Sequence, residues 1–192
     1  MNVVAFNGSP RREGNTAQLL QTVLAPLQKA GADCRVIQVG GEVLRGCTAC
    51  QTCRKLQNQR CVFDDDMVND CIAKMVEADA ILIGSPTYFA NVTTETKALI
   101  DRAGYVLRGS GNPLSRKIGA AVVAVRRAGA MPTFHGINDF FLINDMVVPG
   151  SGYWNLGVGR AEGDVQQDDE GLATMSRLGE NILWLLRNLK NQ

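Results

Sequence analysis

The sequence predicts an α/β fold in which helices cover both faces of a doubly wound, five-stranded parallel sheet. Short apolar runs alternate with segments of helical periodicity along the whole chain. The apolar runs are mostly continuous rather than alternating, which is typical of strands that are buried on both faces. With 192 residues the chain has the size of one domain with a sizeable core, so we predict a single domain over residues 1–192.

The first part of the chain predicts two strands and one helix. The run "VVAF" at residues 3–6 predicts the first strand, and "DCRVIQV" at residues 33–39 predicts the second. Between them, residues 15–31 have apolar side chains at helical spacing, namely Leu19, Leu20, Val23, Leu24 and Leu27. Pro26 lies inside this pattern and predicts a kink or an early end of the helix.

The middle of the chain continues the alternation. Residues 66–78 predict a helix that is capped by Asp66. The continuous apolar run "DAILIGSP" at residues 79–86 predicts the third strand, which ends in a turn. Residues 94–107 then predict another helix.

The last part of the chain completes the sheet. Residues 117–126 predict the fourth strand, and residues 132–145 predict a helix with Pro132 in its first turn. The short run "MVVPG" at residues 146–150 predicts the fifth strand, and residues 169–189 predict a long closing helix. Five strands connected in this way fit the flavodoxin-like order 2-1-3-4-5.

The charge of the chain excludes several classes of function. The formal net charge is +1, which gives no basis for general electrostatic binding to nucleic acid or to an anionic membrane. The N-terminus has no basic region before its apolar run, and no apolar run is long enough to span a membrane. We therefore expect a cytoplasmic protein, and in the cytoplasm thiols stay reduced.

The loop between the first strand and the first helix has the composition of a phosphate site. Its sequence is "FNGSPRREGNTAQLL", at residues 6–20. In a doubly wound sheet this loop lies at the ligand site, and the helix that follows it points free N–H groups at the loop. We expect the phosphate ligands to be Ser9, Arg11, Asn15 and Thr16. The loop matches neither the Walker pattern nor G-x-G-x-x-G, and the alternative is a polar turn with a helix cap.

Three separated motifs resemble the NADPH-dependent FMN reductase group of flavodoxin-like proteins. They are "GSPRREGNT", "GSPTYFANVTTETKALIDR" and "RRAGA…GINDFFLINDMVVPGSGYW", which occur in the expected order and cover nearly the whole chain. The resemblance implies that the first motif binds the phosphate of FMN. It also implies that the second and third motifs form the flavin loops.

The second and third loops supply the remaining candidates for the flavin site. In the second loop these candidates are Pro86, Thr87, Tyr88, Phe89 and Asn91. Backbone amides there would bond the edge of the ring, and an aromatic side chain would form an apolar wall, unless it packs into the core instead. In the third loop the candidates are Arg127, for a reduced flavin or the phosphates of a nicotinamide cofactor, and Gly129, for close backbone approach.

Four of the six cysteines fall in an irregular segment, residues 40–65. They are Cys47, Cys50, Cys53 and Cys61, in the spacing C-x2-C-x2-C-x7-C. Zinc sites generally use two separated pairs, whereas three cysteines at successive x2 steps are the arrangement of ferredoxins. Zinc and redox-active or vestigial thiols stay open as alternatives. The other two cysteines, Cys34 and Cys71, have the pattern of small core residues.

The same cysteines, followed by "DDDM", also resemble the compact motif of the iron–sulfur flavoproteins within this family. That resemblance implies a [4Fe–4S] cluster close to a flavin, often the flavin of a neighbouring protomer. It also implies a homo-oligomer, for which we expect a homodimer or a homotetramer.

We therefore expect an FMN-dependent oxidoreductase or electron-transfer flavoprotein. It would move electrons between NAD(P)H or ferredoxin, FMN and a [4Fe–4S] cluster, and pass them to an acceptor. One alternative is a cluster-free NAD(P)H:FMN or quinone reductase, and another is a non-catalytic redox sensor or electron-carrier module. No side chain stands out as an acid or base, because the only histidine, His135, has no evident partner and is more simply a helix surface residue.

Overall fold

The computed structural model describes residues 1–189 and contains one parallel five-stranded sheet. The strands are β1 (Asn2–Asn7), β2 (Asp33–Gln38), β3 (Ala80–Pro86), β4 (Ile118–Val125) and β5 (Leu156–Val158). Their order in the sheet is β2-β1-β3-β4-β5, and every pairing is parallel. The predicted doubly wound topology is therefore confirmed.

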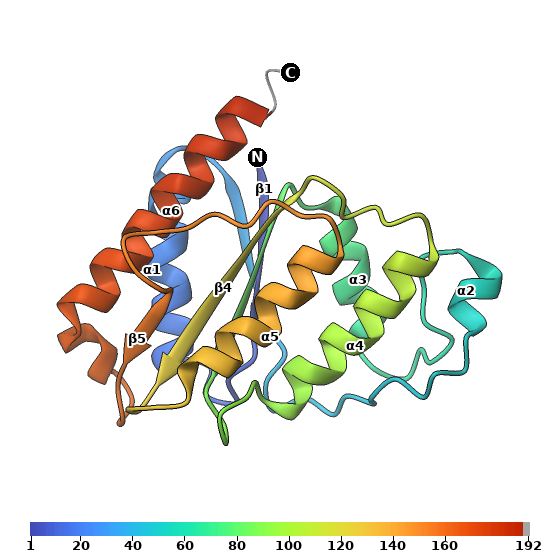
Figure 1. Ribbon diagram of the computed structural model, residues 1–192, viewed down its shortest axis with the longest axis horizontal. Helices are drawn as coiled ribbons and strands as arrows, with labels where there is room; N and C mark the ends of the chain where they lie inside the picture. Colours follow the sequence, from blue (N-terminus) through green and yellow to red (C-terminus); the bar gives the residue numbers. More distant parts are fainter. Residues whose placement is uncertain (190–192) are drawn as a thin grey trace.

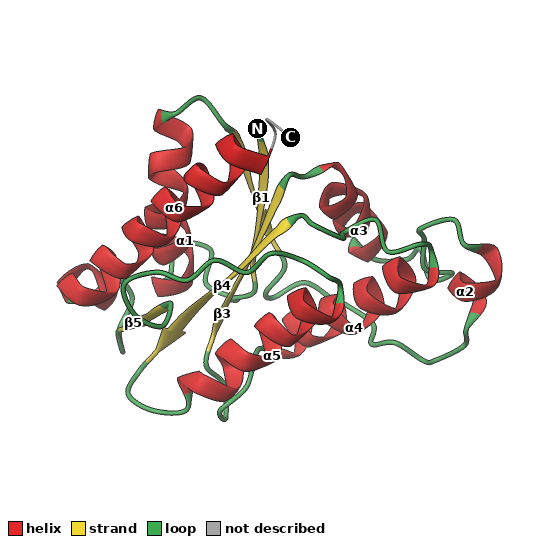
Figure 2. Ribbon diagram, turned by 45° about the horizontal axis from the view of Figure 1, so that its top comes forward, coloured by secondary structure: helices red, strands yellow, loops and turns green. Residues whose placement is uncertain are grey.

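Helices cover both faces of this sheet (Figures 1 and 2). One face is covered by α1 (Asn15–Lys29) and α6 (Asp169–Leu189). The other face is covered by α3 (Val68–Glu77), α4 (Thr94–Gly109) and α5 (Ala130–Ile143). Two short elements were not predicted, namely α2 (Thr52–Leu56) and the 3-10 helix η1 (Asp164–Gln167).

The central strands are buried on both sides, which explains their continuous apolar sequences. In β1, Val3 and Ala5 belong to the core under α1 and α6, whereas Val4 and Phe6 belong to the core under α3, α4 and α5. All five apolar side chains predicted for the buried face of α1 are buried. Each such leucine or valine contributes roughly 1.5–3 kcal/mol through burial.

The first helix does not end at its proline. Helix α1 continues through Pro26 to Lys29, so the early end that we considered does not occur. Near the other end of the helix, Gly84 of β3 leaves room for Thr16 and Leu20, whose side chains would lie within 3.0 Å of an added Cβ. Close packing of α1 on the sheet therefore depends on this glycine.

The prediction for the fifth strand was wrong in its position. Residues 146–150 make only one isolated bridge, from Val147 to Ile118 at the start of β4. The chain then leaves the sheet at Pro149, which has no N–H to donate to a ladder, and returns to β4 as Leu156–Val158. The outer side of β4 is thus paired in two short pieces rather than along one strand.

None of the helices in the described part of the chain has the length and apolar character that a membrane span requires.

Candidate functional site

A pocket lies beyond the carboxyl ends of β1, β3 and β4, where a doubly wound sheet binds its ligand. It contains about 600 Å³ of empty space. The residues that line it come from the ends of β3 and β4, the adjoining loops and the start of α1, namely Ser9, Arg11, Asn15, Thr16, Pro86, Thr87, Tyr88, Ala124, Val125, Arg126, Gly159 and Arg160. The structure thus brings together seven of the residues that we predicted for the flavin site.

The phosphate loop is shaped by hydrogen bonds within itself. The side-chain oxygen of Asn7 accepts a bond from the Ser9 N–H, and Ser9 Oγ accepts a bond of 3.2 Å from the Arg11 N–H. This arrangement leaves the hydroxyl hydrogen of Ser9 available to a ligand. Thr16 is buried on the first turn of α1, whose free backbone N–H groups face the same loop.

Asn15 lines the pocket and also ties a distant loop to it. Its Nδ2 donates a bond of 2.8 Å to the Ala161 carbonyl, and its Oδ1 accepts a bond of 2.8 Å from the Gly163 N–H. The segment 159–163 is therefore held against the N-terminus of α1. This contact places Gly159 and Arg160 in the wall of the pocket.

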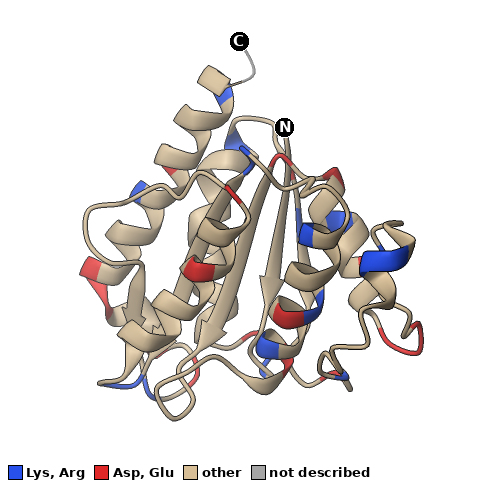
Figure 3. Cartoon of the chain, turned by 45° about the vertical axis from the view of Figure 1, so that its right-hand side comes forward, with Lys and Arg blue, Asp and Glu red and all other residues tan. Residues whose placement is uncertain are grey.

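Three arginines line this pocket without an acidic partner. Among the described residues, the guanidinium groups of Arg11, Arg126 and Arg160 make no salt bridge or hydrogen bond, although the backbone N–H of Arg160 donates to Asp164. In contrast, the neighbouring Arg12 pairs with Glu42 at 3.2 Å on the surface. Figure 3 shows basic residues on the loops at this end of the sheet. Unpaired guanidinium groups around one pocket favour an anionic ligand.

The second loop adds a buried polar atom that has no partner. Thr87 Oγ1 is buried and makes no hydrogen bond in the described structure, although the Thr87 N–H donates to the Ala124 carbonyl. Because a buried hydroxyl without a partner is costly, this atom indicates a missing ligand. Tyr88 lies beside it in the same wall, half exposed.

Four predicted residues lie outside the lining of the pocket. Phe89 is fully exposed, and its φ of 47° places it in the left-handed region. Asn91 closes the loop through backbone bonds to Tyr88, and Arg127 is exposed. Gly129 has a φ of 85°, and a Cβ there would lie 3.2 Å from Ala90 Cβ. This glycine keeps the third loop close to the second.

The residues of this pocket fit FMN. The phosphate would meet the hydroxyl of Ser9, the N-terminus of α1 and unpaired arginines. The ring would meet the second loop, where the Thr87 hydroxyl lacks a partner. His135 takes no part in this pocket and lies exposed on α5, as the sequence suggested.

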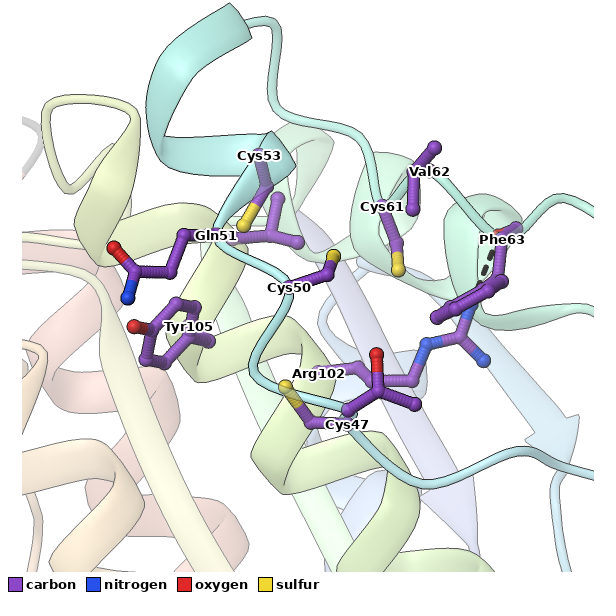
Figure 4. A pocket seen from close by; sticks show the side chains of 11 residues that line it. Cys47, Cys50, Gln51, Cys53, Cys61, Val62, Phe63, Arg102 and Tyr105 are labelled. Atoms are coloured by element: carbon purple, nitrogen blue, oxygen red, sulfur yellow. Dashed lines mark hydrogen bonds between the residues drawn. The ribbon is translucent and has the colours of Figure 1, made fainter.

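The four clustered cysteines line a second pocket, which contains about 310 Å³ of empty space (Figure 4). Cys53 is buried and Cys61 is half-buried, whereas Cys47 and Cys50 are exposed. The remaining lining comes mainly from the cysteine loop and α4, namely Thr48, Gln51, Val62, Phe63, Arg102, Tyr105 and Val106. The predicted cysteine site is therefore one continuous pocket.

Buried polar side chains hold Cys61 in place. Asn69, which is only 3% exposed, accepts a bond of 2.8 Å from the Cys61 N–H and donates one of 3.0 Å to the Cys61 carbonyl. Its Nδ2 also donates to the Phe63 carbonyl and to Asp64. One asparagine on α3 thus orders the backbone around the fourth cysteine.

An ion pair between Arg102 and Asp66 lies behind the same pocket, with both side chains buried. The predicted cap at Asp66 is wrong by one position, because α3 begins at Val68 and its N-cap residue is Met67. Asp66 Oδ1 still accepts a bond of 3.1 Å from the Val68 N–H, while Oδ2 pairs with Arg102. Burial would raise the pKa of Asp66, but the hydrogen bonds from Arg102, Arg45 and Val68 outweigh it and lower the pKa.

The spacing of the cysteines differs from that of a single-ion site. Within residues 1–189, no three histidine, cysteine or acidic side chains converge closely enough to surround one metal ion. A [4Fe–4S] cluster presents a different iron to each thiolate, so its ligands lie further apart than the four around a zinc ion. Four cysteines around one pocket therefore fit a cluster better than zinc.

The two other cysteines lie outside this pocket. Cys71 is buried on α3 beside Met75 and the half-buried Met67, as predicted. Burial raises the pKa of its thiol to about 12. Cys34 is half-buried on β2, and burial raises the pKa of its thiol as well.

Several residues of the two pockets were not predicted. Arg126 follows β4 and lines the pocket, whereas its neighbour Arg127 is the arginine of the third motif that we predicted for the site. Arg160 follows β5, which lies later in the chain than we predicted. Asn69 and Arg102 lie on α3 and α4, and no sequence pattern linked either residue to the cysteines. Only the tertiary fold brings these side chains to the two pockets.

Comparisons with known proteins show the family and the fold of this chain. Residues 1–161 match the protein family described as NADPH-dependent FMN reductase. The chain is 36% identical to an iron-sulfur flavoprotein of Methanocaldococcus jannaschii, over 99% of this chain and 100% of that protein. It is 30% identical to an iron-sulfur flavoprotein of Methanosarcina thermophila, over 95% and 93% of the two chains. A solved flavodoxin from the domain Archaea superposes with a TM-score of 0.63, covering 97% and 99% of the two chains, and at 16% identity it shows a likeness of fold alone.

Proposed function

The chain belongs to the NADPH-dependent FMN reductase family of flavodoxin-like, FMN-dependent oxidoreductases, and we propose that it combines FMN with a [4Fe–4S] cluster. In this proposal electrons move between NAD(P)H or a ferredoxin, the FMN and the cluster, and then pass to an acceptor. The observation that carries the proposal is the presence of two pockets on one chain. One is lined by anion-binding and ring-binding groups, and the other by all four clustered cysteines.

In the first pocket we assign Ser9, Arg11, Asn15 and Thr16 to the phosphate of FMN. The hydroxyls and the N-terminus of α1 would donate hydrogen bonds to it, and the arginines would neutralise its charge. Asn15 would act mainly by holding the segment 159–163, because both of its amide atoms already have partners there.

For the flavin ring we assign Pro86, Thr87 and Tyr88 to its edge and wall. Bound FMN accepts a hydride and releases electrons singly, which is chemistry that the cofactor itself provides. The task of the chain is to orient the ring, with the Thr87 hydroxyl as a donor that has no other partner. We place Phe89, Asn91, Arg127 and Gly129 at the margin of this site, where they shape the loops.

In the second pocket we assign Cys47, Cys50, Cys53 and Cys61 to the cluster. Cys53 and Cys61 would form its inner side, and the exposed Cys47 and Cys50 its outer side. The names of the relatives support this assignment. We place the protein in the cytoplasm, where such thiolates stay reduced.

We further propose a homodimer or homotetramer. Two apolar side chains on loops are almost fully exposed, namely Val43 at 93% and Phe89 at 107%. Exposed apolar residues of this kind mark contact surfaces when they lie together. A second copy of the chain is the partner that the family resemblance implies.

The experiment that tests the proposal is purification without oxygen, followed by absorption spectroscopy and assays of FMN, iron and sulfide per chain. We expect FMN together with about four iron atoms per chain. Cys53→Ser should lose iron and keep FMN. The matched control is Cys34→Ser, which should keep both, because Cys34 lies on β2 outside the cysteine pocket.

Each outcome separates the two parts of the proposal. If the purified protein contains FMN but no iron, the flavin assignment is supported and the cluster assignment is refuted. Protein that binds no FMN even after its addition would overturn the flavin assignment.

A cluster-free reductase or redox sensor is the second candidate, and one observation favours it. Cys50 is exposed, and hydrogen bonds from Thr52 lower the pKa of its thiol. A thiol with a lowered pKa is a better nucleophile and is more readily oxidised. FMN without iron, together with reversible oxidation of Cys50, would support this candidate.

A further inference from the structure

Arg102 is the one fully buried cation beside the cysteine pocket among the described residues. It comes from the middle of α4, its side chain is 0% exposed, and it lines the pocket together with the four cysteines. Figure 4 shows its guanidinium group close to Cys61. Other basic side chains of the same loop, such as Arg54, are exposed.

Most donors of this guanidinium group already have partners. One terminal nitrogen donates to Asp66 and, at 3.2 Å, to the Arg45 carbonyl. The other donates to the Phe63 carbonyl at 2.9 Å. These bonds fix the plane of the group, because a guanidinium presents its donors in a rigid fork.

The remaining nitrogen, Nε, is buried and makes no hydrogen bond of good geometry within residues 1–189. The guanidinium group nevertheless interacts with the Cys61 thiol, and this interaction, together with Asp66, raises the pKa of Arg102 against the effect of burial. A buried charged donor that makes no bond is costly, so Nε needs an acceptor on the pocket side. Since Arg102 and Cys61 line the same pocket, that acceptor is the Cys61 sulfur or the group that fills the pocket.

We propose that Arg102 donates its Nε–H to a sulfur atom of the cluster or of Cys61, and thereby raises the reduction potential of the cluster. This inference rests on the proposed [4Fe–4S] function. Hydrogen bonds to sulfur and the local charge set the potentials of such clusters. A buried cation favours the reduced state, which carries one more negative charge, and water screens it little.

Asp66 limits this effect. Its carboxylate is 4% exposed and compensates the charge of Arg102 through a terminal nitrogen, not through Nε. The pair therefore acts as a dipole with its positive end toward the cysteines. Removing the cation and removing the anion should consequently shift the potential in opposite directions.

The test is a redox titration of the anaerobically purified protein, with the cluster followed by electron paramagnetic resonance and FMN as an internal reference. In Arg102→Met the equilibrium constant for one-electron reduction of the cluster should fall at least about tenfold, which is about 59 mV. In Asp66→Asn it should rise. Arg102→Lys keeps the charge but lacks the planar fork, so its shift should lie between Arg102→Met and the natural protein.

The matched control is Arg54→Met, which removes a cation of the same loop. The Arg54 guanidinium lies 4.4 Å from the centre of the Tyr105 ring but is exposed, so water already screens its charge. The shift in the reduction potential of the cluster should therefore be much smaller in Arg54→Met than in Arg102→Met. If Arg102→Met fails to fold, the double variant Arg102→Met, Asp66→Asn leaves no unpaired buried charge and tests the same donor.

Two results would overturn the inference, and they are distinguishable. A loaded cluster with an unchanged potential in both the Arg102→Met and the double variant would refute the role of Arg102 alone. Absence of iron from the natural protein would refute the proposed cluster and this inference with it.

Discussion

The side-chain amide of Asn15 accepts a hydrogen bond of 2.8 Å from the backbone N–H of Gly163, which lies 148 residues further along the chain. This bond and its companion to Ala161 join the start of the first helix to the loop that follows the last strand. One wall of the pocket is thus built from the first connection of the sheet and from the loop that follows its last strand.

We predict that Asn15→Ala weakens FMN binding by up to about thirtyfold, because two hydrogen bonds of about 1 kcal/mol each no longer order the segment 159–163. Titration of apoprotein with FMN, followed by quenching of flavin fluorescence, measures the effect. Asn181→Ala is the control, since Asn181 likewise donates to a distant carbonyl, that of Gly150, away from the pocket. Equal affinity in the two variants would contradict the prediction.

The unpaired arginines give a second prediction. Arg11→Gln, Arg126→Gln and Arg160→Gln should each weaken FMN binding about tenfold or more, because a charged hydrogen bond to phosphate contributes about 1.5–3 kcal/mol. Arg12→Gln, whose side chain pairs with Glu42 on the surface, should change little. The same FMN titration at low and high salt measures this. Riboflavin, which lacks the phosphate, should not distinguish the variants.

The buried ion pair predicts a large effect on stability. Arg102→Met should lower the free energy of unfolding of the apoprotein by about 3–5 kcal/mol, because it leaves the Asp66 carboxylate buried and unpaired. The double variant Arg102→Met, Asp66→Asn should recover part of that loss. Arg177→Met removes an exposed partner of Glu180 and should cost less than about 1 kcal/mol. Urea unfolding followed by circular dichroism gives all three values.

The thiol of Cys71 predicts a dependence of stability on alkaline pH. Its pKa is raised from 9.0 to about 12 by burial, so above pH 9 the unfolded chain loses this proton while the folded chain keeps it. Stability therefore falls as pH rises from 9 toward 12, by about 1.4 kcal/mol at pH 10 from this group. Urea unfolding of Cys71→Ala and of the natural chain measures the difference in their free energies of unfolding. This difference should be constant near neutral pH and should change above pH 9. A difference that stays constant up to pH 10 would refute the raised pKa.

A close backbone contact predicts sensitivity at Gly40. A Cβ at this position would lie 2.3 Å from the Ser9 carbonyl carbon and 2.4 Å from the Gly8 oxygen. Gly40→Ala should therefore displace the phosphate loop and weaken FMN binding. Gly46→Ala is the control from the same connection, because a Cβ there meets nothing within 4 Å. Thermal unfolding of both apoproteins would separate loss of affinity from loss of the fold.

The fold was largely predictable because β1, β3 and β4 are buried on both faces and leave continuous apolar sequences. The fifth strand was misplaced because its apolar signal is weak. It has three residues, of which only Gly157 is buried, whereas the earlier "MVV" reads more strongly as a strand. The short helix α2 carries no apolar periodicity, so no pattern could reveal it.

The candidate site was predictable where its residues share one loop. Ser9, Arg11 and Thr16 are neighbours in sequence, as are the cysteines of the second pocket. Contacts such as that of Arg102 with Asp66, 36 residues apart, depend on how α4 packs against the cysteine loop. Such a pair has no local signature, because the sequence indicates only a helix cap at Asp66 and an ordinary charged helix position at Arg102.

The interrupted fifth strand also bears on how the molecule avoids aggregation. An exposed sheet edge is a template on which another chain can add a strand. At one edge of the sheet, β4 is covered only by the three residues of β5 and by the single bridge to Val147. Between these two pieces the chain leaves the sheet. At the other edge β2 carries the charged pair Asp33 and Arg35. Neither edge presents a long apolar strand, so sheet-to-sheet polymerisation is disfavoured even when the flavin is absent.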